Sequence, residues 1–136
     1  MDVWQIALVV ARIVFSAFFV MSGINHFTRM KQMAEYAKAV GNVPAAPAAV
    51  MGTGVLLLVG GLSILLGFHP RIGALLLVVF LVPTSFMMHA YWKIADPMQK
   101  AGDMAQFWKN ISLAGARRYV WPTPFESGDA DRRSDA

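Results

Sequence analysis

AAVMGTGVLLLVGGLSILLGF, residues 48–68, is apolar and carries no charged side chain. A helix that crosses a bilayer needs about 20 mostly apolar residues, each rising 1.5 Å. Two further stretches, 3–24 and 72–92, meet the same requirement, and the second of these is uncharged up to Lys93. The sequence therefore predicts an all-α integral membrane protein with three spanning helices.

The composition supports the same fold class. Hydrophobic residues make up 57% of the 136 residues and charged residues 15%, whereas soluble domains are about 25% charged. A chain of this length has no aqueous core large enough to bury that apolar surface, so we expect one small bundle in lipid. The chain also has no cysteine, which excludes disulfides and thiolate chemistry within it. Its start lacks the basic region of a cleaved signal peptide, so the first stretch is interpreted as a retained span.

The segments between the spans carry helix and turn signals. Apolar residues in 30–41 recur at helical spacing, which predicts a short interfacial helix ending at Gly41-Asn42. A polar connecting loop is the alternative. Pro47 suits the first turn of the next helix. In the second span, small side chains share one face, where they favour close helix packing over a ligand groove. These residues are Thr53, Gly60, Ser63 and Gly67.

The third span and the segment after it contain irregular features. Pro83 removes a helix hydrogen bond and predicts a kink, which Thr84 and Ser85 would help to satisfy. The tight turn at 68–71 makes the second and third spans antiparallel neighbours. Asp103 resembles a helix cap, and the apolar part of the helix predicted over 103–118 covers about 15 Å, half of the hydrocarbon thickness. We expect a short or partial fourth helix.

The charges predict an orientation. Of the twelve Lys and Arg residues, Arg12 lies inside a span, and with three spans the 68–71 turn holds Arg71 while the remaining ten lie on the opposite side. The protein is expected in a bacterial inner membrane. The positive-inside rule then predicts that the N-terminus lies outside and the tail in the cytoplasm. If the fourth segment also spans the membrane, the ratio of Lys and Arg residues on the two sides becomes about six to five and does not decide the orientation. The pI of about 9.8 is explained by this topology and by anionic lipid, so no nucleic-acid partner is expected.

Polar residues in and near the spans form a candidate pocket. Arg12 is costly within a membrane, which makes it a functional candidate, and the first and third spans run in the same direction, so His26 and His89 should lie at the same membrane side. The candidate pocket residues are Arg12, Ser16, Asn25, His26, Ser85, His89 and Trp92.

Three interpretations of these residues stay open. In the first, they anchor the helices at the interface and form interhelical hydrogen bonds. In the second, they hold an anionic or quinone-like head group. In the third, the two histidines ligate haem or a metal. Haem is the less favoured cofactor and no metal site is expected. The spans contain no carboxylate pair, nucleophile–base pair or phosphate-binding loop, so no catalytic residue is assigned.

Three phrases carry a family resemblance. GINHFTRMKQMAEYAKAVGNVP at 23–44, GGLSILLGFHPRIGALLLVVFLVPTSFMMHAYW at 60–92 and DMAQFWKNISLAGA at 103–116 resemble the DoxX family of small bacterial membrane proteins. The family is a four-helix membrane bundle named from a subunit associated with thiosulfate:quinone oxidoreduction. The resemblance implies a domain over 1–116, followed by a polar tail at 117–136 that is expected to be disordered or surface-bound.

The sequence departs from the family at two places. Many relatives carry an acidic residue in the second span, where this chain has Thr53-Gly54-Val55, so a role through that carboxylate is not expected. The fourth helix should also continue apolar, but Arg117-Arg118 follow, and the tail resembles an out-of-frame reading or a truncation.

The resemblance implies an accessory or quinone-linked component of a membrane redox process. Its expected partners are the lipid bilayer, membrane or cytoplasmic redox proteins, and further copies of the chain. A small-solute transporter or channel built around Arg12, and a membrane scaffold or assembly factor, are the alternatives.

Overall fold

The computed structural model describes residues 2–120, which are almost entirely helical. The helices are α1 (Val3–Thr28), α2 (Met30–Gly41), α3 (Ala46–Leu66), α4 (Pro70–Met88), the 3-10 helix η1 (Tyr91–Lys93) and α5 (Pro97–Val120). The predicted all-α fold class is confirmed.

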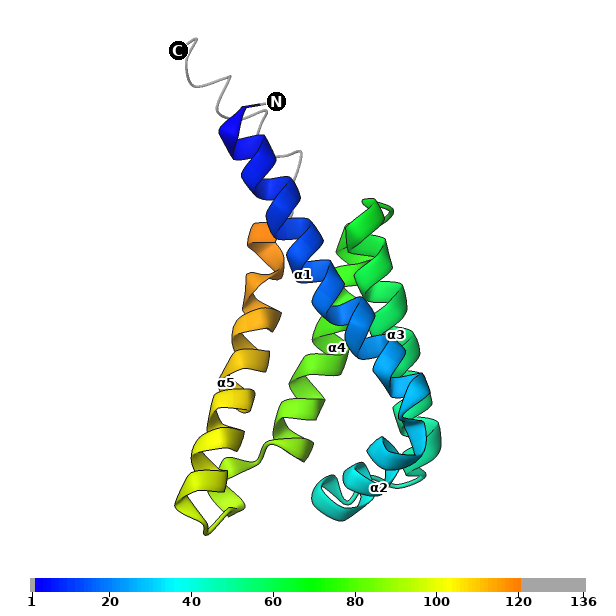
Figure 1. Cartoon of the computed structure of the whole chain (residues 1–136), viewed down its shortest axis with the longest axis vertical. Helices are drawn as coiled ribbons and strands as arrows, with labels where there is room; N and C mark the ends of the chain where they lie inside the picture. The colour runs from blue at the N-terminus through cyan, green and yellow to red at the C-terminus, as the bar shows by residue number, and fades with distance from the viewer. Residues whose placement is uncertain (1, 121–136) are drawn as a thin grey trace.

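Four helices lie along the long axis of the molecule, and α2 lies across its lower end (Figure 1). α1 packs on α3, α3 on α4, and α4 on α5, whereas α1 and α5 meet over a short contact only. The α3–α4 turn is tight, so these helices are antiparallel neighbours as predicted. The N-terminus lies at the same end as this turn, and the opposite end carries α2 and the connection between α4 and α5.

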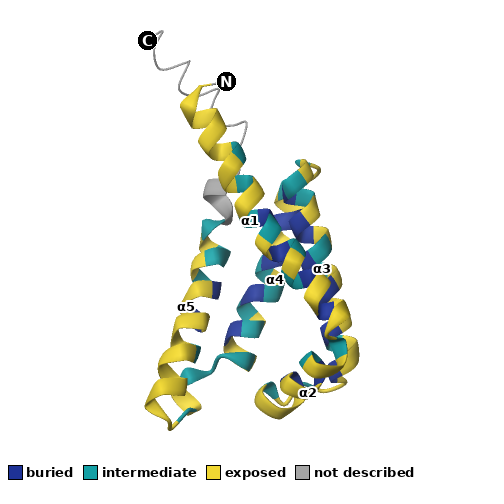
Figure 2. Ribbon diagram, viewed as in Figure 1, coloured by how far each residue is buried: buried dark blue, intermediate teal, exposed yellow. Residues whose placement is uncertain are grey.

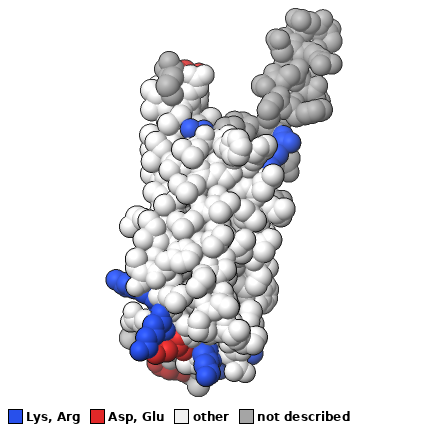
Figure 3. Space-filling view, turned by 90° about the vertical axis from the view of Figure 1, so that its right-hand side faces the viewer, with Lys and Arg blue, Asp and Glu red and all other residues white. Residues whose placement is uncertain are grey.

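The outer surface of the helices is apolar. Val14 is 66% exposed and Leu75 52%, although both lie well inside their helices. Figure 2 shows buried residues on the inward faces of α3 and α4 and exposed residues on the outward faces. In Figure 3 the charged side chains gather near the ends and leave the middle of the molecule almost free of charge. Three of the described helical segments are long and apolar enough to cross a membrane: Val3–Thr28, Ala46–Leu66 and Pro70–Lys93. The chain is therefore membrane-embedded.

Glycines set the spacing between the spans. A Cβ atom on Gly73 of α4 would lie 2.7 Å from the Cβ of Ser63 and 2.9 Å from the carbonyl oxygen of Gly60 on α3. A Cβ on Gly23 of α1 would lie 2.7 Å from Leu58 of α3. The small face predicted for the second span is therefore a packing face at Gly60 and Ser63. Around it, Phe19, Leu57, Leu77 and Leu81 form the buried core.

The segment 30–41 is a helix, not a loop. Its apolar face buries Ala34 and Ala37 against Ala46 and Val50 of α3, and it ends at Asn42, which adopts the left-handed conformation with a φ of 51°. Asparagine tolerates this conformation better than most residues, so the predicted end at Gly41-Asn42 is confirmed.

The fourth segment begins earlier than predicted. Asp96 Oδ1 accepts a hydrogen bond from the Met98 amide, and Pro97 suits the first turn of a helix, so α5 starts at Pro97 and not at Asp103. Its 24 residues extend about 36 Å, which is longer than the partial helix expected. The capping role predicted for Asp103 is wrong, because Asp103 lies inside the helix.

The third span is not one continuous helix. The apolar segment reaches Lys93, but α4 stops at Met88, so His89 lies beyond α4 and Trp92 lies in η1. Pro83 lies inside α4 as expected. Ser85 Oγ donates to the Leu81 carbonyl at 2.7 Å, so it does not satisfy the Val79 carbonyl that loses its usual donor. Most of the predicted disordered tail, residues 121–136, lies outside the described residues.

Candidate functional site: a cavity beside α2

A cavity of about 360 Å³ lies in the half of the bundle nearest α2. Its walls come from α1, α3, α4 and α5, and α2 contributes Met33, Tyr36 and Ala37. Most of the lining is apolar, and no aspartate or glutamate is part of it. The polar lining residues are Ser22, His26, Tyr36, Thr53, Thr84, His89, Lys109 and Asn110.

His26 forms the α1 wall of the cavity. Its side chain is buried, and Nδ1 lies 2.7 Å from the carbonyl oxygen of Ser22. A carbonyl only accepts, so Nδ1 carries the proton and donates, which leaves Nε2 as an acceptor in the neutral ring. The ring of Phe80 from α4 packs edge-on at a centroid distance of 5.8 Å and fixes the imidazole plane. His26 thus offers one fixed acceptor atom.

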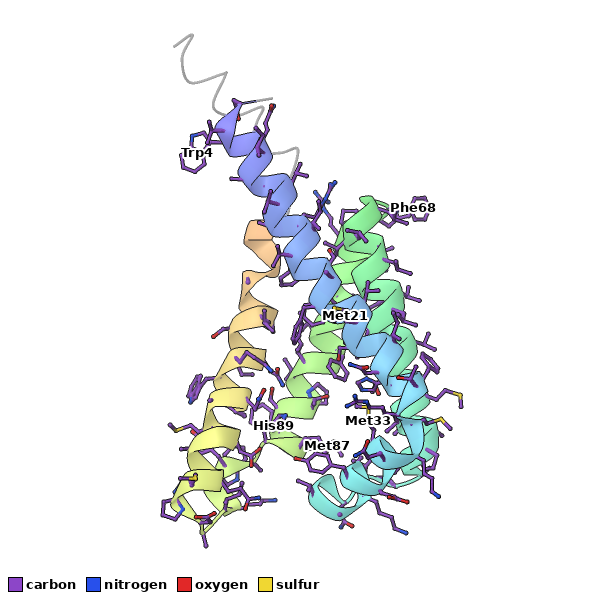
Figure 4. The ribbon with its side chains drawn as sticks, in the orientation of Figure 1. Trp4, Met21, Met33, Phe68, Met87 and His89 are labelled. Atoms are coloured by element: carbon purple, nitrogen blue, oxygen red, sulfur yellow. The ribbon has the colours of Figure 1, made fainter. Side chains whose placement is uncertain are left out.

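His89 joins the end of α4 to α5. Its Nδ1 lies 2.9 Å from Oδ1 of Asp103, and both side chains are largely buried, at 19% and 15% exposure. Figure 4 shows His89 in the space between the two helices, with Met33 and Met87 nearer α2. The carboxylate accepts from Nδ1, which orients the ring and leaves Nε2 for other contacts.

Asn110 forms the α5 wall. It is 6% exposed, yet its amide makes no hydrogen bond with any residue in 2–120. Its amide atoms are not fully enclosed by protein, so the side chain has the capacity to hydrogen-bond a ligand in the cavity. Asp103 and Phe107 lie seven and three residues before it, so the three side chains share one helix face.

Two comparisons place this chain among known proteins. The DoxX family profile matches residues 7–90, which is more than half of the chain. The chain belongs to the DoxX family. The DoxX chain is also similar to the inner membrane protein YphA of Escherichia coli strain K12, with 28% identity over 111 residues, covering 82% of this chain and 78% of YphA. No solved structure matches it.

The DoxX fold brings two of the predicted pocket residues, His26 and His89, to one cavity. Asn25 is exposed on the outside of α1, and Trp92 is 48% exposed and packs on Phe86 and Phe107. Tryptophan at a helix end is typical of the membrane–water interface, so Trp92 fits the alternative of an interfacial anchor.

The other three predicted residues also lie outside the cavity lining. Arg12 is partly buried on α1, nearer the N-terminal end of the bundle. Ser85 is fully buried and bonds within its own helix. Ser16 is fully buried, and its hydroxyl has no hydrogen-bond partner among the residues described.

Sequence reasoning missed the contributions of Asp103, Lys109 and Asn110 to the site of this DoxX protein. The spacing of Asp103, Phe107 and Asn110 on one helix face was the available signal. It was not used because Asp103 was interpreted as the cap at the start of the helix. Within residues 2–120, no group of three His, Asp or Glu side chains lies close enough to hold a metal ion.

Proposed function

We propose that this DoxX protein binds a quinone-type redox molecule of the bilayer in the cavity beside α2, as an accessory or quinone-linked component of a membrane redox process. One observation carries the proposal. His26 and Asn110, each more than nine-tenths buried, line the same apolar cavity with polar atoms that bind no other described side chain.

The hydrogen-bonding groups of a quinone head group match the acceptor of His26 and the amide of Asn110 in the cavity wall. A quinol hydroxyl donates to an acceptor such as Nε2 of His26, and a quinone oxygen accepts from an amide such as that of Asn110. The apolar lining, which includes Phe19 and Leu81, suits the ring and the isoprenoid-type tail. Small-molecule sites are typically apolar pockets in which a few polar groups point toward the ligand.

The protein itself supplies no redox group. It has no cysteine, so electron transfer requires the bound molecule together with a partner protein. This DoxX chain would then hold the quinone and orient it. Haem held by His26 and His89 is the alternative cofactor, and a visible absorbance spectrum recorded with and without reductant distinguishes the two. The transport alternative relied on Arg12, which does not line the cavity, so the cavity gives it no support.

The orientation is a separate part of the proposal, because α5 ends at the same end of the molecule as the α3–α4 turn and the Lys and Arg residues are then divided almost evenly. Arg29, Lys31, Lys38, Lys93 and Lys100 lie at the α2 end, whereas Arg71 and positions 117 and 118 lie at the other. We propose that the α2 end and the cavity face the cytoplasm, because the short connections at that end carry the five basic residues named first. YphA is an inner membrane protein, which supports the same membrane for this chain.

Binding of a short-chain ubiquinone analogue to the purified protein in mild detergent tests the proposal. We expect saturable calorimetric binding by the wild-type protein and a loss of about tenfold or more in affinity for His26→Leu, because a buried hydrogen bond is removed. Asn25→Leu is the matched control, because Asn25 is the exposed neighbour on the same helix. Binding that is absent from the wild type, or equal in both variants, would contradict the proposal.

A further inference from the structure

Lys109 gives the cavity an uncompensated positive charge. It is part of the cavity lining, which contains no aspartate or glutamate. Its ammonium group donates to the Gln106 amide oxygen, a neutral acceptor, and forms no salt bridge with any residue the structure describes. The carboxylate of Asp103, also on α5, is engaged by His89. A charge in this position is not neutralised by the cavity walls.

Lys109 is an exposed residue of α5, but it lies level with the middle of α1. Its Nζ is 5.5 Å from the ring centroid of Phe18, which belongs to the middle part of the apolar helix α1. A lysine at this level of a membrane protein is expensive unless it is hydrated or paired. The contact with an aromatic ring offsets only part of that cost. An anionic ligand atom would offset more of it.

Asn110 lies beside Lys109 in the sequence and lines the same cavity. Its amide N–H donors are not used by described residues, so an ammonium and an amide are both available from α5. Hydrogen bonds in which one group is ionised are shorter and about twice as strong as neutral ones. This pair of donors favours an oxygen that carries a negative charge.

We infer that the cavity selects the anionic form of its ligand, an acidic hydroxyl on a quinone-type ring that has lost its proton. Lys109 supplies the opposing charge and Asn110 a further donor, while the apolar walls hold the ring. This inference rests on the proposed function and adds the charge of the ligand to it.

Two probes of nearly equal shape test the inference. Lawsone is a hydroxynaphthoquinone that is an anion at neutral pH, and its methyl ether is uncharged. Calorimetric titration of the full-length protein in detergent, with empty micelles as the blank, gives both affinities. We expect lawsone to bind about tenfold to a hundredfold more tightly than the ether, as for a charge-assisted hydrogen bond. Equal affinities overturn the inference but leave the proposed function standing, whereas no binding of either probe overturns both.

Variants of two lysines on α5 assign the selectivity. Lys109→Gln should reduce the preference for lawsone to less than about threefold, and Lys109→Arg should keep it, because the charge is retained. Lys100→Gln is the control, since Lys100 is exposed on the same helix and lies outside the cavity lining. An unchanged preference in Lys109→Gln, or an equal loss in Lys100→Gln, would overturn the assignment. The comparison of the two probes on the wild type decides the inference even if Lys109→Gln does not fold.

Discussion

His89 and Asp103 connect the end of α4 to the second turn of α5, with Nδ1 and Oδ1 2.9 Å apart. This contact bridges the Tyr91–Lys93 connection and places α5 against α4, so that Asn110, two turns further along, reaches the cavity. The pair therefore positions the α5 wall of the site, and its loss should affect both stability and binding.

A double-mutant cycle on this pair measures its contribution. His89→Gln and Asp103→Asn should each lower the free energy of unfolding, with a coupling energy of about 1 kcal/mol, because the two groups are partly exposed and partly screened. Chemical denaturation in detergent gives the values. Asp96→Asn, an exposed carboxylate before α5, is the control. A coupling energy near zero would mean that the contact does not join the helices.

Glycine substitutions should separate helix packing from helix propensity. Gly73→Ala places a methyl group against Ser63 and the Gly60 backbone, so we expect a destabilisation of about 1–3 kcal/mol from overpacking. Gly102→Ala meets no atom within 4 Å, so α5 should gain up to about 1 kcal/mol from the better helix former. Thermal unfolding of the two variants should shift in opposite directions, and a shift of the same sign would refute the packing argument.

Asn110 should matter for binding and not for folding. Asn110→Leu removes a buried amide that has no described partner, so the unfolding free energy of the ligand-free protein should stay the same or rise by about 1 kcal/mol. The affinity for the quinone analogue should fall about tenfold. Unfolding and titration on the same preparation test both. A marked destabilisation with unchanged affinity would make Asn110 a structural residue.

Single cysteines report the orientation, because the natural chain has none. Lys38→Cys on α2 and Gly102→Cys on α5 should react with an impermeant maleimide only from the cytoplasmic side, and Phe68→Cys at the α3–α4 turn only from outside. Intact cells and inverted vesicles provide the two sides. Labelling of position 68 in inverted vesicles alone would reverse the orientation.

The sequence predicted the spans because each is a long apolar run, with Arg12 the one charged residue among them, and it predicted the α3–α4 pairing because only a short turn joins these helices. It also placed His26 and His89 at one end, since the first and third spans run in parallel. It misplaced the start of α5 because Asp103 and Gln106 resemble a local cap, while the contact of Asp103 with His89 depends on tertiary packing. The cavity could not be predicted for the same reason: Lys109 and Asn110 acquire their roles only when α5 lies against α4.

Mass spectrometry of the organic extract of the protein, purified in mild detergent, shows whether the cavity holds a quinone-type molecule from the membrane. We expect a co-purifying quinone in the wild type and much less of it in Asn110→Leu prepared in parallel. An extract without any quinone, or equal amounts of quinone in both proteins, would contradict the proposed function.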